Sequence, residues 1–456
     1  MERPRGTLRR AGVFLSSLAL AALWPARAQA QDSQYWTLQY GPVAELLGGT
    51  VVGSSRDLSA TFYNPGALAL TKDPSLLASV ESFEATSLKA VGVPPTLDFS
   101  DTNIRPSPTL FAFALPRSMT GSHTWAISSL TRQDLDLRVD NWQVTPSRQA
   151  GAESLFDQSL TENWFGLSWA HPVGRHSGLG LTTYVVYRGQ RTRREISGQA
   201  ALSPTDGGAA LFVEDFDYAN YRLVWKAGFS TQRDSWDAGL TVTSARVNLF
   251  GSGEASYTRS AVGADLGAGR VVAVSTQHAD GLGSHYASPW SVAAGGAYRR
   301  GKNSFHGTVE WFASVPAFDV LDTSPFATDP AAEGLVKRLQ RKAKSVVNFG
   351  TGYQRTVSER FSYYAAFTTD FTFAEKDDAA TNSLSTWDIY HVTAGASLLT
   401  HSVKLTMGAA YAFGSDQRSI STLVIPPPVG APVLTPTPFD VKFSRLRLLV
   451  GFDFGR

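Results

Sequence analysis

Residues 403–413 read VKLTMGAAYAF and alternate between apolar side chains, most of them large, and small or polar ones. Successive side chains of a β-strand point to opposite faces, so this stretch is predicted to be a strand with one apolar face. The same alternation occurs in residues 236–243, 305–313 and 361–373, and again in the C-terminal residues 446–454. Its repetition along the chain predicts an all-β protein.

Fourteen stretches fit this pattern, and most of them are 10 to 16 residues long. Strands of soluble proteins usually span about five or six residues, whereas a tilted strand needs about 9–11 residues to cross a bilayer. The lengths therefore predict a transmembrane antiparallel β-barrel of about 14 strands. The predicted strands lie near residues 75–87, 107–116, 122–134, 160–172, 177–193, 216–231, 235–249, 290–300, 303–314, 344–356, 360–373, 387–399, 402–413 and 441–454.

The connections between these strands alternate between short and long. Outer-membrane barrels have an even number of strands, short periplasmic turns and long external loops. This alternation therefore predicts such a barrel, with both termini in the periplasm. The short connections are residues 117–121, 173–176, 232–234, 301–302, 357–359 and 400–401; the long ones are residues 88–106, 135–159, 194–215, 250–289, 315–343, 374–386 and 414–440.

Three of the long connections have features of their own. Residues 329–344 are predicted to form a short amphipathic helix, whose basic face either contacts lipopolysaccharide phosphates or faces solvent. A further helical turn is expected within residues 147–160. Residues 425–438 are rich in proline, which has no backbone N–H, so we expect an external loop there.

The composition agrees with a membrane barrel. Charged residues make up 18% of the chain, below the roughly 25% of ordinary soluble domains, and aromatic residues make up 11%. The chain has no cysteine, so it has no disulfide. Beyond the first thirty residues, no stretch of 18 apolar residues suggests a transmembrane helix.

Residues 1–30 have the features of a secretory signal peptide. Arg9 and Arg10 belong to a basic head, residues 11–24 are apolar, and residues 28–30 read AQA, a pattern that signal peptidase cleaves. Removing this segment with its five basic and one acidic residues leaves 36 basic and 38 acidic residues. Such a balance gives no reason to expect a nucleic-acid partner.

Residues 31–73 contain no amphipathic strand. Brief helical turns are expected at residues 41–47 and 56–60, separated by glycine breaks, and residues 61–69 then read TFYNPGALA. Proline after Asn64 forces that asparagine out of a helical conformation, and Gly66 permits a positive φ. A barrel does not need such a segment, which makes sense as a hatch inside the lumen. We therefore predict a hatch or plug over 31–73 and the barrel over 74–456.

Residues 47–53 and 60–69 resemble the N-terminal hatch of the FadL family, outer-membrane transporters of long-chain fatty acids and other hydrophobic compounds. That family has a fourteen-stranded barrel and an Asn-Pro-Ala motif in its hatch. Gly66 replaces the alanine here, which should keep the turn but loosen it. The family also has a lateral exit at a kink in its third strand. The third predicted strand, residues 122–134, has no glycine or proline that would indicate one.

The resemblance implies a monomeric channel in the outer membrane of a Gram-negative bacterium. Its function would be passive uptake of long-chain fatty acids or other hydrophobic small molecules, gated by the hatch. Its partners would be this cargo, outer-membrane lipid and lipopolysaccharide, and the barrel-assembly machinery, whose recognition signal the C-terminal strand resembles. The alternative is a FadL-like barrel that serves as a structural or secretion-associated scaffold. The hatch motif is Tyr63, Asn64, Pro65, Gly66 and Ala67, and we expect the mobile part of the hatch there.

Several charged residues fall on the inward face of the predicted strands. They either pair in the lumen and position the hatch, or some of the basic ones hold the carboxylate of a fatty acid. The candidates for ligand binding are Arg222, Lys226, Arg445 and Arg447. The other inward charges are Asp237, Glu310, Asp370, Lys404 and Asp453.

An enzymatic function is not indicated. Some outer-membrane barrels are lipases, but none of the eight histidines lies in a recognisable nucleophile motif, and no Gly-x-Ser-x-Gly sequence occurs. No paired metal-ligand spacing occurs either. We expect neither a catalytic site, a metal nor a cofactor.

Overall fold

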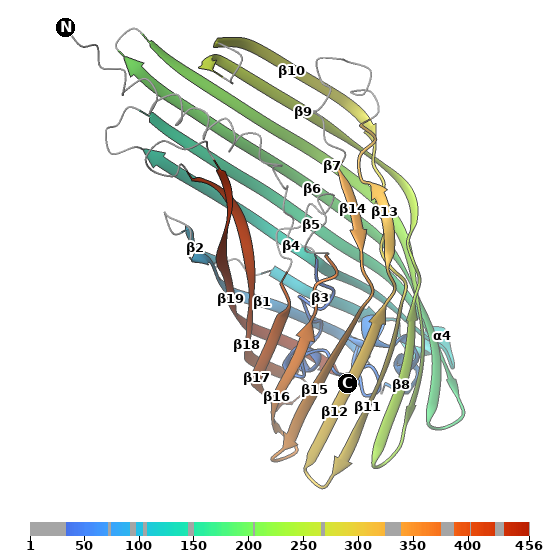
Figure 1. The fold of residues 1–456 in the computed structure, drawn as a ribbon. Helices are drawn as coiled ribbons and strands as arrows, with labels where there is room; N and C mark the ends of the chain where they lie inside the picture. The colour runs from blue at the N-terminus through green and yellow to red at the C-terminus, as the bar shows by residue number, and fades with distance from the viewer. Residues whose placement is uncertain are drawn as a thin grey trace, which may run out of the picture.

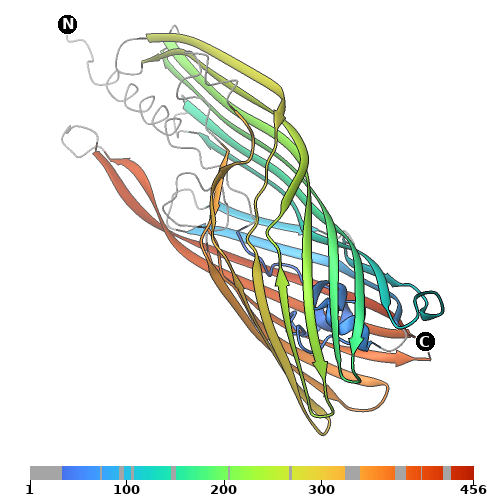
Figure 2. The same ribbon diagram turned by 90° about the vertical axis from the view of Figure 1, so that its right-hand side faces the viewer.

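The structure is a computed structural model that describes residues 33–71, 74–91, 97–103, 107–144, 150–203, 206–265, 270–323, 339–374, 387–401, 403–424 and 433–455. These residues form a closed, transmembrane antiparallel β-barrel with a short, mostly helical N-terminal segment in its lumen (Figures 1 and 2). The predicted fold class is confirmed. The predicted signal peptide, residues 1–30, lies outside the described residues.

The barrel has fourteen strand positions, although seventeen strands form its sheet. Three positions are each occupied by two successive strands. β2 and β3 both pair with β1, β8 and β9 both pair with β7, and β10 and β11 pair with β9 and β8. The last strand pairs with the first and closes the barrel.

Each of the fourteen predicted strands has a counterpart in the barrel. Two further strands, β13 and β14, pair only with each other. The strands are β1 Pro74–Val91, β2 Leu97–Asn103, β3 Ser107–Ala114, β4 Thr124–Val144, β5 Ala150–Val173, β6 Ser177–Ser203, β7 Asp206–Gln232, β8 Trp236–Thr243, β9 Val247–Asp265, β10 Arg270–Gly283, β11 Ser291–Arg300, β12 Asn303–Phe312, β13 Val315–Asp319, β14 Gln340–Ala343, β15 Val346–Thr356, β16 Phe361–Asp370, β17 Ile389–Thr400, β18 Val403–Val424 and β19 Val433–Gly455.

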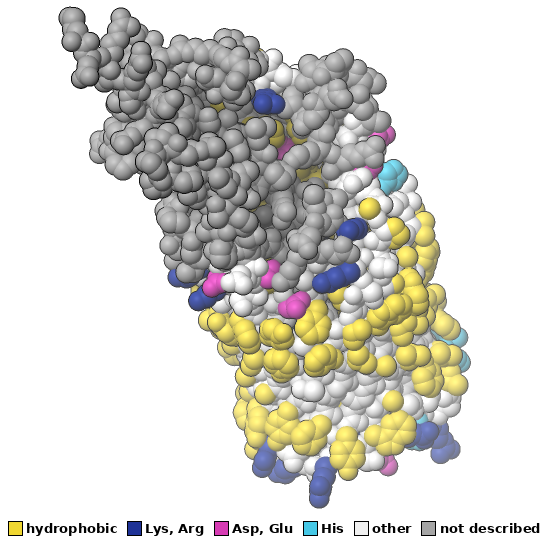
Figure 3. All heavy atoms as spheres, viewed as in Figure 1, with side chains coloured by type: hydrophobic (Ala, Val, Ile, Leu, Met, Phe, Trp, Pro, Cys, Tyr) yellow, Lys and Arg dark blue, Asp and Glu magenta, His cyan; other side chains and the backbone are white. Residues whose placement is uncertain are grey.

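On the face drawn in Figure 3, apolar side chains form a band across the lower half of the barrel. Along β5, for example, Phe165 and Leu167 are exposed while Trp164 and Ser168 are buried, as a lipid-facing outer surface requires. The short turns and the C-terminus lie at the same end, as predicted (Figure 2). None of the described helices is long and apolar enough to cross a membrane.

The prediction of long loops was wrong in most places, because the strands continue beyond the apolar band. β6 and β7 each have 27 residues and pair almost to their shared tip. Their outer parts are held by pairing with each other and with the neighbouring strands β5 and β9, and they need no lipid-facing surface. The alternation of apolar and polar residues is therefore lost there, and with it the signal that identified the strands.

Three predictions inside these connections need correction or lie beyond the described chain. The helical turn expected within 147–160 is wrong, because residues 150–160 belong to β5. The end of the helix expected over 329–344 is strand β14, and residues 324–338 lie outside the described residues. The proline-rich loop is also partly wrong, because Pro436 and Pro438 lie in β19 and pair with β18. Among the described residues, β1 pairs with β19 only from Asp440 onward, so Pro436 and Pro438 lie where the described ladder has one partner strand and the missing N–H is tolerated.

The lumenal segment, defined here as residues 33–71, contains two short α-helices and a 3-10 helix. They are α2 Pro42–Leu46, α3 Ala60–Tyr63 and η1 Pro65–Leu70; one more short helix, α4 Arg117–Thr120, lies in a turn of the barrel. The apolar residues of the segment, such as Leu46 and Leu68, form one buried cluster with inward residues of the barrel, such as Tyr184 and Tyr364. The barrel and the segment thus share a core.

The third strand position has an irregularity that its sequence did not indicate. β4 shifts its register against β5 between Thr131 and Gln133. Arg132 lies in this bulge and donates to the Tyr35 carbonyl oxygen and to the Tyr40 hydroxyl. β3 and β4 pair only from Ala114 to Leu110, so the described ladder between them ends at the level of the bulge. No glycine or proline is needed, because the bulge serves to turn the arginine inward.

Candidate functional site

A cavity of about 100 Å³ lies between the lumenal segment and the barrel wall. One side of it is aromatic. The ring of Tyr35 stacks on Phe312 at 4.2 Å and on Phe373 at 4.6 Å between ring centroids, and Trp36 and Phe62 also line the space. Aromatic walls of this kind bury an apolar ligand and orient it through ring contacts.

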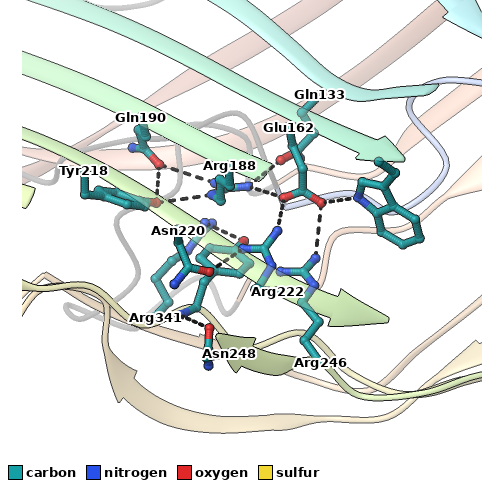
Figure 4. Close-up of polar contacts among 12 residues, drawn as sticks. Gln133, Glu162, Arg188, Gln190, Tyr218, Asn220, Arg222, Arg246, Asn248 and Arg341 are labelled. Atoms are coloured by element: carbon teal, nitrogen blue, oxygen red, sulfur yellow. Dashed lines mark hydrogen bonds and ion pairs between the residues drawn. The ribbon is translucent and has the colours of Figure 1, made fainter. Parts of the chain in front are cut away.

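The other side of the cavity carries an arginine cluster, defined here as Arg188, Arg222, Arg246 and Arg341 around Glu162 and Tyr286. Figure 4 shows the guanidinium groups of Arg188, Arg222 and Arg246 converging on Glu162. Glu162 Oε2 pairs with Arg188 Nη1 at 3.0 Å and with Arg222 Nη2 at 2.9 Å, and its Oε1 pairs with Arg246 Nη2 at 3.4 Å. Arg341 Nη1 donates to the Tyr286 hydroxyl at 2.9 Å.

The ring of Tyr286 holds these cations together. The guanidinium carbons of Arg188, Arg222 and Arg246 lie 4.1, 4.6 and 4.7 Å from its centroid. That of Arg341 lies 5.4 Å away. A tyrosine face attracts cations and lets them approach one another more closely than they would in its absence.

Strand register and strand breaks together build the cluster. Arg188 of β6 lies directly opposite Glu162 of β5, and Arg222 of β7 comes from the next strand along. Arg246 lies in the break between β8 and β9, and Tyr286 in the break between β10 and β11. These two breaks occupy neighbouring positions of the barrel, so both side chains leave the alternation of the wall and turn inward.

The hatch motif is held tightly by the barrel. Asn64 has an extended backbone (φ −160°, ψ 97°), as predicted, and its Oδ1 accepts the Gly66 N–H at 3.1 Å. Its Nδ2 donates to the carbonyl oxygens of Val52 and Phe229, each at 2.8 Å. One side chain thus caps the 3-10 helix and ties it both to the lumenal segment and to β7.

Gly66 does not use the positive φ that glycine permits. A Cβ on Gly66 would lie 2.6 Å from the carbonyl oxygens of both Gly178 and Gly228. Glycine is therefore required by the close approach of the turn to β6 and β7.

Tyr63 is a buried hydrogen-bonding residue of the same motif. Its hydroxyl donates to Gln39 Oε1 at 2.8 Å and accepts the Tyr40 N–H at 2.9 Å. Burial raises the pKa of Tyr63 well above its ordinary value, so the hydroxyl stays protonated and keeps both bonds.

Two buried aspartates attach the lumenal segment to the wall. Asp370 Oδ1 accepts the backbone N–H groups of Tyr35 at 3.0 Å and Trp36 at 2.9 Å. Asp237 pairs with Arg56 at 3.2 Å and also with Arg299 of β11. Asp237 and Asp370 therefore position the lumenal segment. This agrees with the interpretation that inward charges pair in the lumen and hold the hatch in place.

Comparisons with known proteins place this architecture. The sequence matches no protein-family model and no curated protein. Solved structures do match. A FadL homologue of Pseudomonas aeruginosa is 12% identical, with 92% of this chain and 99% of that one covered and a TM-score of 0.56. The chain has the FadL-type fold.

Two further FadL-type structures match at similar levels. The toluene transporter TbuX of Ralstonia pickettii is 11% identical over 91% of this chain and 98% of its own, with a TM-score of 0.56. The toluene transporter TodX of Pseudomonas putida is 10% identical over 92% and 99%, with a TM-score of 0.59. These neighbours are transporters, not enzymes.

The structure separates the four predicted ligand-binding residues of this FadL-type barrel into two pairs. Arg222 belongs to the arginine cluster, and Lys226 lines the same cavity, with its Nζ 4.2 Å from the centroid of Phe62. Arg445 and Arg447 do not line it. Arg445 pairs with Glu84 at 3.9 Å, and Arg447 donates to the Thr37 carbonyl oxygen at 3.0 Å.

Sequence reasoning missed most of the arginine cluster. Arg188 and Glu162 lie in predicted strands, and their opposition could have been found once the hairpin was set in register. Arg246 was placed in an unbroken strand, Tyr286 in a loop and Arg341 in the helix expected over 329–344. Nothing in their local sequence indicates that they meet.

Proposed function

We propose that this chain is an outer-membrane channel of a Gram-negative bacterium for passive uptake of long-chain fatty acids or other hydrophobic small molecules. The observation that carries the proposal is the aromatic cavity beside the lumenal segment, inside a barrel whose outer surface carries a band of exposed apolar side chains. The FadL-type fold and the toluene transporters that share it support the same class of cargo. No energy source and no chemical step are required.

In this proposal the lumenal segment is the gate. Cargo enters from the extracellular side, occupies the aromatic cavity and moves on when the segment shifts. The hinge is placed at Tyr63–Ala67, where α3 ends and η1 begins. The Asn64 side chain is the natural latch, because its bonds to Val52 and Phe229 connect the hinge to two other parts of the structure.

A lateral exit is proposed beside β4. The bulge at Arg132 lies where the described β3–β4 pairing ends, at Leu110 and Leu130. Arg132 Nη1 donates to the Tyr40 hydroxyl of the lumenal segment, so a movement of the segment would displace Arg132 in the bulge.

The test is uptake of radiolabelled oleate by proteoliposomes that carry the whole mature chain, with and without Asn64→Ala combined with Pro65→Ala. We expect uptake to depend on the protein and to change several-fold in the variant, because the latch and the turn are both lost. A matched control is Asn303→Ala, at the first residue of β12 and away from the lumenal segment, which should leave uptake unchanged. A correctly inserted barrel that takes up no oleate and binds no other hydrophobic compound would favour the scaffold function.

A further inference from the structure

The end of the barrel that carries the short turns has a positively charged surface. Figure 3 shows Lys and Arg side chains at this end, below the apolar band. Several exposed arginines of the described turns and adjoining strand ends have side chains that make neither an ion pair nor a hydrogen bond with a described residue. They are Arg175, Arg233, Arg300, Arg355 and Arg360, and the exposed carboxylates of the same turns are Asp234 and Glu359. The whole chain has 41 basic and 39 acidic residues, so this surplus is local.

Two of these arginines, Arg300 and Arg355, lie on the outer face of the wall and are called here the outward arginine pair. Arg300 is the last residue of β11 and Arg355 the last but one of β15, and both pair in register with Asn303 of β12. One strand thus separates them, which places their Cα atoms about 10 Å apart at the usual strand spacing. Two arginine side chains at this separation can reach the same headgroup.

An aromatic row lies next to the outward arginine pair, two residues further along each strand into the apolar band. Tyr298 of β11, Phe305 of β12 and Tyr353 of β15 are partners in register, and the ring centroids of Phe305 and Tyr353 are 5.4 Å apart. Tyr298 and Phe305 are 55% and 53% exposed. Aromatic rings at the edge of the apolar band of a membrane barrel lie at the interface with the headgroups. The outward arginine pair therefore lies at headgroup level.

The other charges of these turns face elsewhere. Lys302 Nζ donates to the Val357 carbonyl oxygen at 2.9 Å, and Arg299 pairs with the buried Asp237. Lys302, Arg299 and Glu359 all line a cavity of about 610 Å³ below the lumenal segment. Glu359 makes no ion pair with the outward arginine pair, whose charge is thus available to a ligand outside the barrel.

We propose that Arg300 and Arg355 bind the phosphate of an anionic phospholipid in the leaflet next to the short turns, with its acyl chains against the aromatic row. Guanidinium groups bind phosphate oxygens through paired, charge-assisted hydrogen bonds. Two unpaired cations favour a headgroup with a net negative charge over a zwitterionic one, whose own ammonium group they repel. In the proposed setting, this leaflet faces the periplasm. The inference goes beyond the proposed function, because it concerns the outer wall and not the cargo.

The test is a lipid titration of the whole mature chain in detergent, with the lipid-bound fraction measured by native mass spectrometry. The probes are phosphatidylglycerol and phosphatidylethanolamine with identical oleoyl chains. The variant is Arg300→Gln combined with Arg355→Gln, and the two single variants give the same comparison if the double variant does not fold. The control, Arg138→Gln with Arg193→Gln, removes the same charge from side chains that are 65% and 44% exposed on the outer parts of β4 and β6.

We expect the wild-type protein to bind phosphatidylglycerol at least about tenfold more tightly than phosphatidylethanolamine, as two arginines at the headgroup level predict. The double variant should bind the two lipids within about twofold of each other, through a loss of phosphatidylglycerol affinity alone. The control should keep the wild-type preference.

A wild-type protein without a preference for phosphatidylglycerol would overturn the inference and would leave the arginines to an acidic protein partner. A preference that survives in the double variant, or that the control loses equally, would overturn it as well. Uptake of oleate is a separate measurement, so each of these outcomes leaves the proposed channel intact.

Discussion

At the scale of single residues, the turn of the hatch motif depends on the absence of a side chain. Gly66 faces the carbonyl oxygens of Gly178 and Gly228, and Gly180 in turn lies against the Pro65 carbonyl. Three barrel glycines on two neighbouring strands thus allow Pro65 and Gly66 to pack directly against the backbone of the wall. Glycine is needed at position 66 for this close packing and not for backbone freedom, because Gly66 has no positive φ.

We predict that Gly66→Ala destabilises the folded protein by about 1–3 kcal/mol, the usual range for a group forced into a packed interior. Both oxygens that a Cβ would meet belong to the backbone and cannot rotate away. Urea unfolding in detergent, followed by tryptophan fluorescence, measures the change. Gly283→Ala is the control, since a Cβ there meets nothing within 4 Å and φ is not positive. Equal stabilities of the two variants would contradict the packing argument.

At the scale of elements, the beginning of the lumenal segment has no helix or strand to define it. Its order comes from Asp370 at the end of β16, which accepts two successive backbone N–H groups and the amide of Asn348. A buried carboxylate with several donors is a strong acceptor, so this one residue replaces the hydrogen bonds that a regular element would supply.

Asp370→Asn is therefore expected to release residues 34–37 from the wall. An amide accepts less strongly than a carboxylate and brings two donors of its own, so the loss should be about 1.5–3 kcal/mol of local stability. Hydrogen exchange of peptides covering these residues should speed up about tenfold or more. Asp388→Asn is the matched control, because Asp388 accepts a backbone N–H from Thr372 of the barrel. Unchanged exchange at 34–37 would argue against Asp370 as the anchor.

At the scale of the whole molecule, the barrel closes without the lumenal segment, because β1 and β19 pair directly. We predict that a chain without residues 33–71 still inserts but conducts small hydrophilic solutes, since the segment fills the lumen between inward residues of the strands. Liposome swelling with arabinose measures this. The intact chain should give little swelling. If the truncated chain is folded, as judged by its heat-modifiable migration on a gel, and also gives little swelling, other residues close the lumen.

The sequence predicted the features that depend on local or periodic patterns and missed those that depend on contacts between distant residues. Within the apolar band, lipid outside and lumen inside impose a period of two, so all fourteen strand positions were found. Beyond the band the outer face of a strand need not be apolar, so the alternation is lost. The outer halves of β6 and β7 were therefore predicted to be loops. The hatch motif was found because Asn64 and Pro65 act locally. The arginine cluster was not, because Arg246 and Tyr286 meet only through two breaks in the wall.

The length of β6 and β7 has a consequence for where the mouth of this barrel opens. Residues 188–203 of β6 continue past the level of the arginine cluster, and at about 3.3 Å per residue and a tilt near 40° they rise roughly 40 Å further. In the proposed setting, that height crosses the carbohydrate layer that covers the cell. A hydrophobic compound dissolves poorly in such a hydrated carbohydrate layer. The extended barrel would therefore first carry the cargo through the carbohydrate layer, and only then through the bilayer.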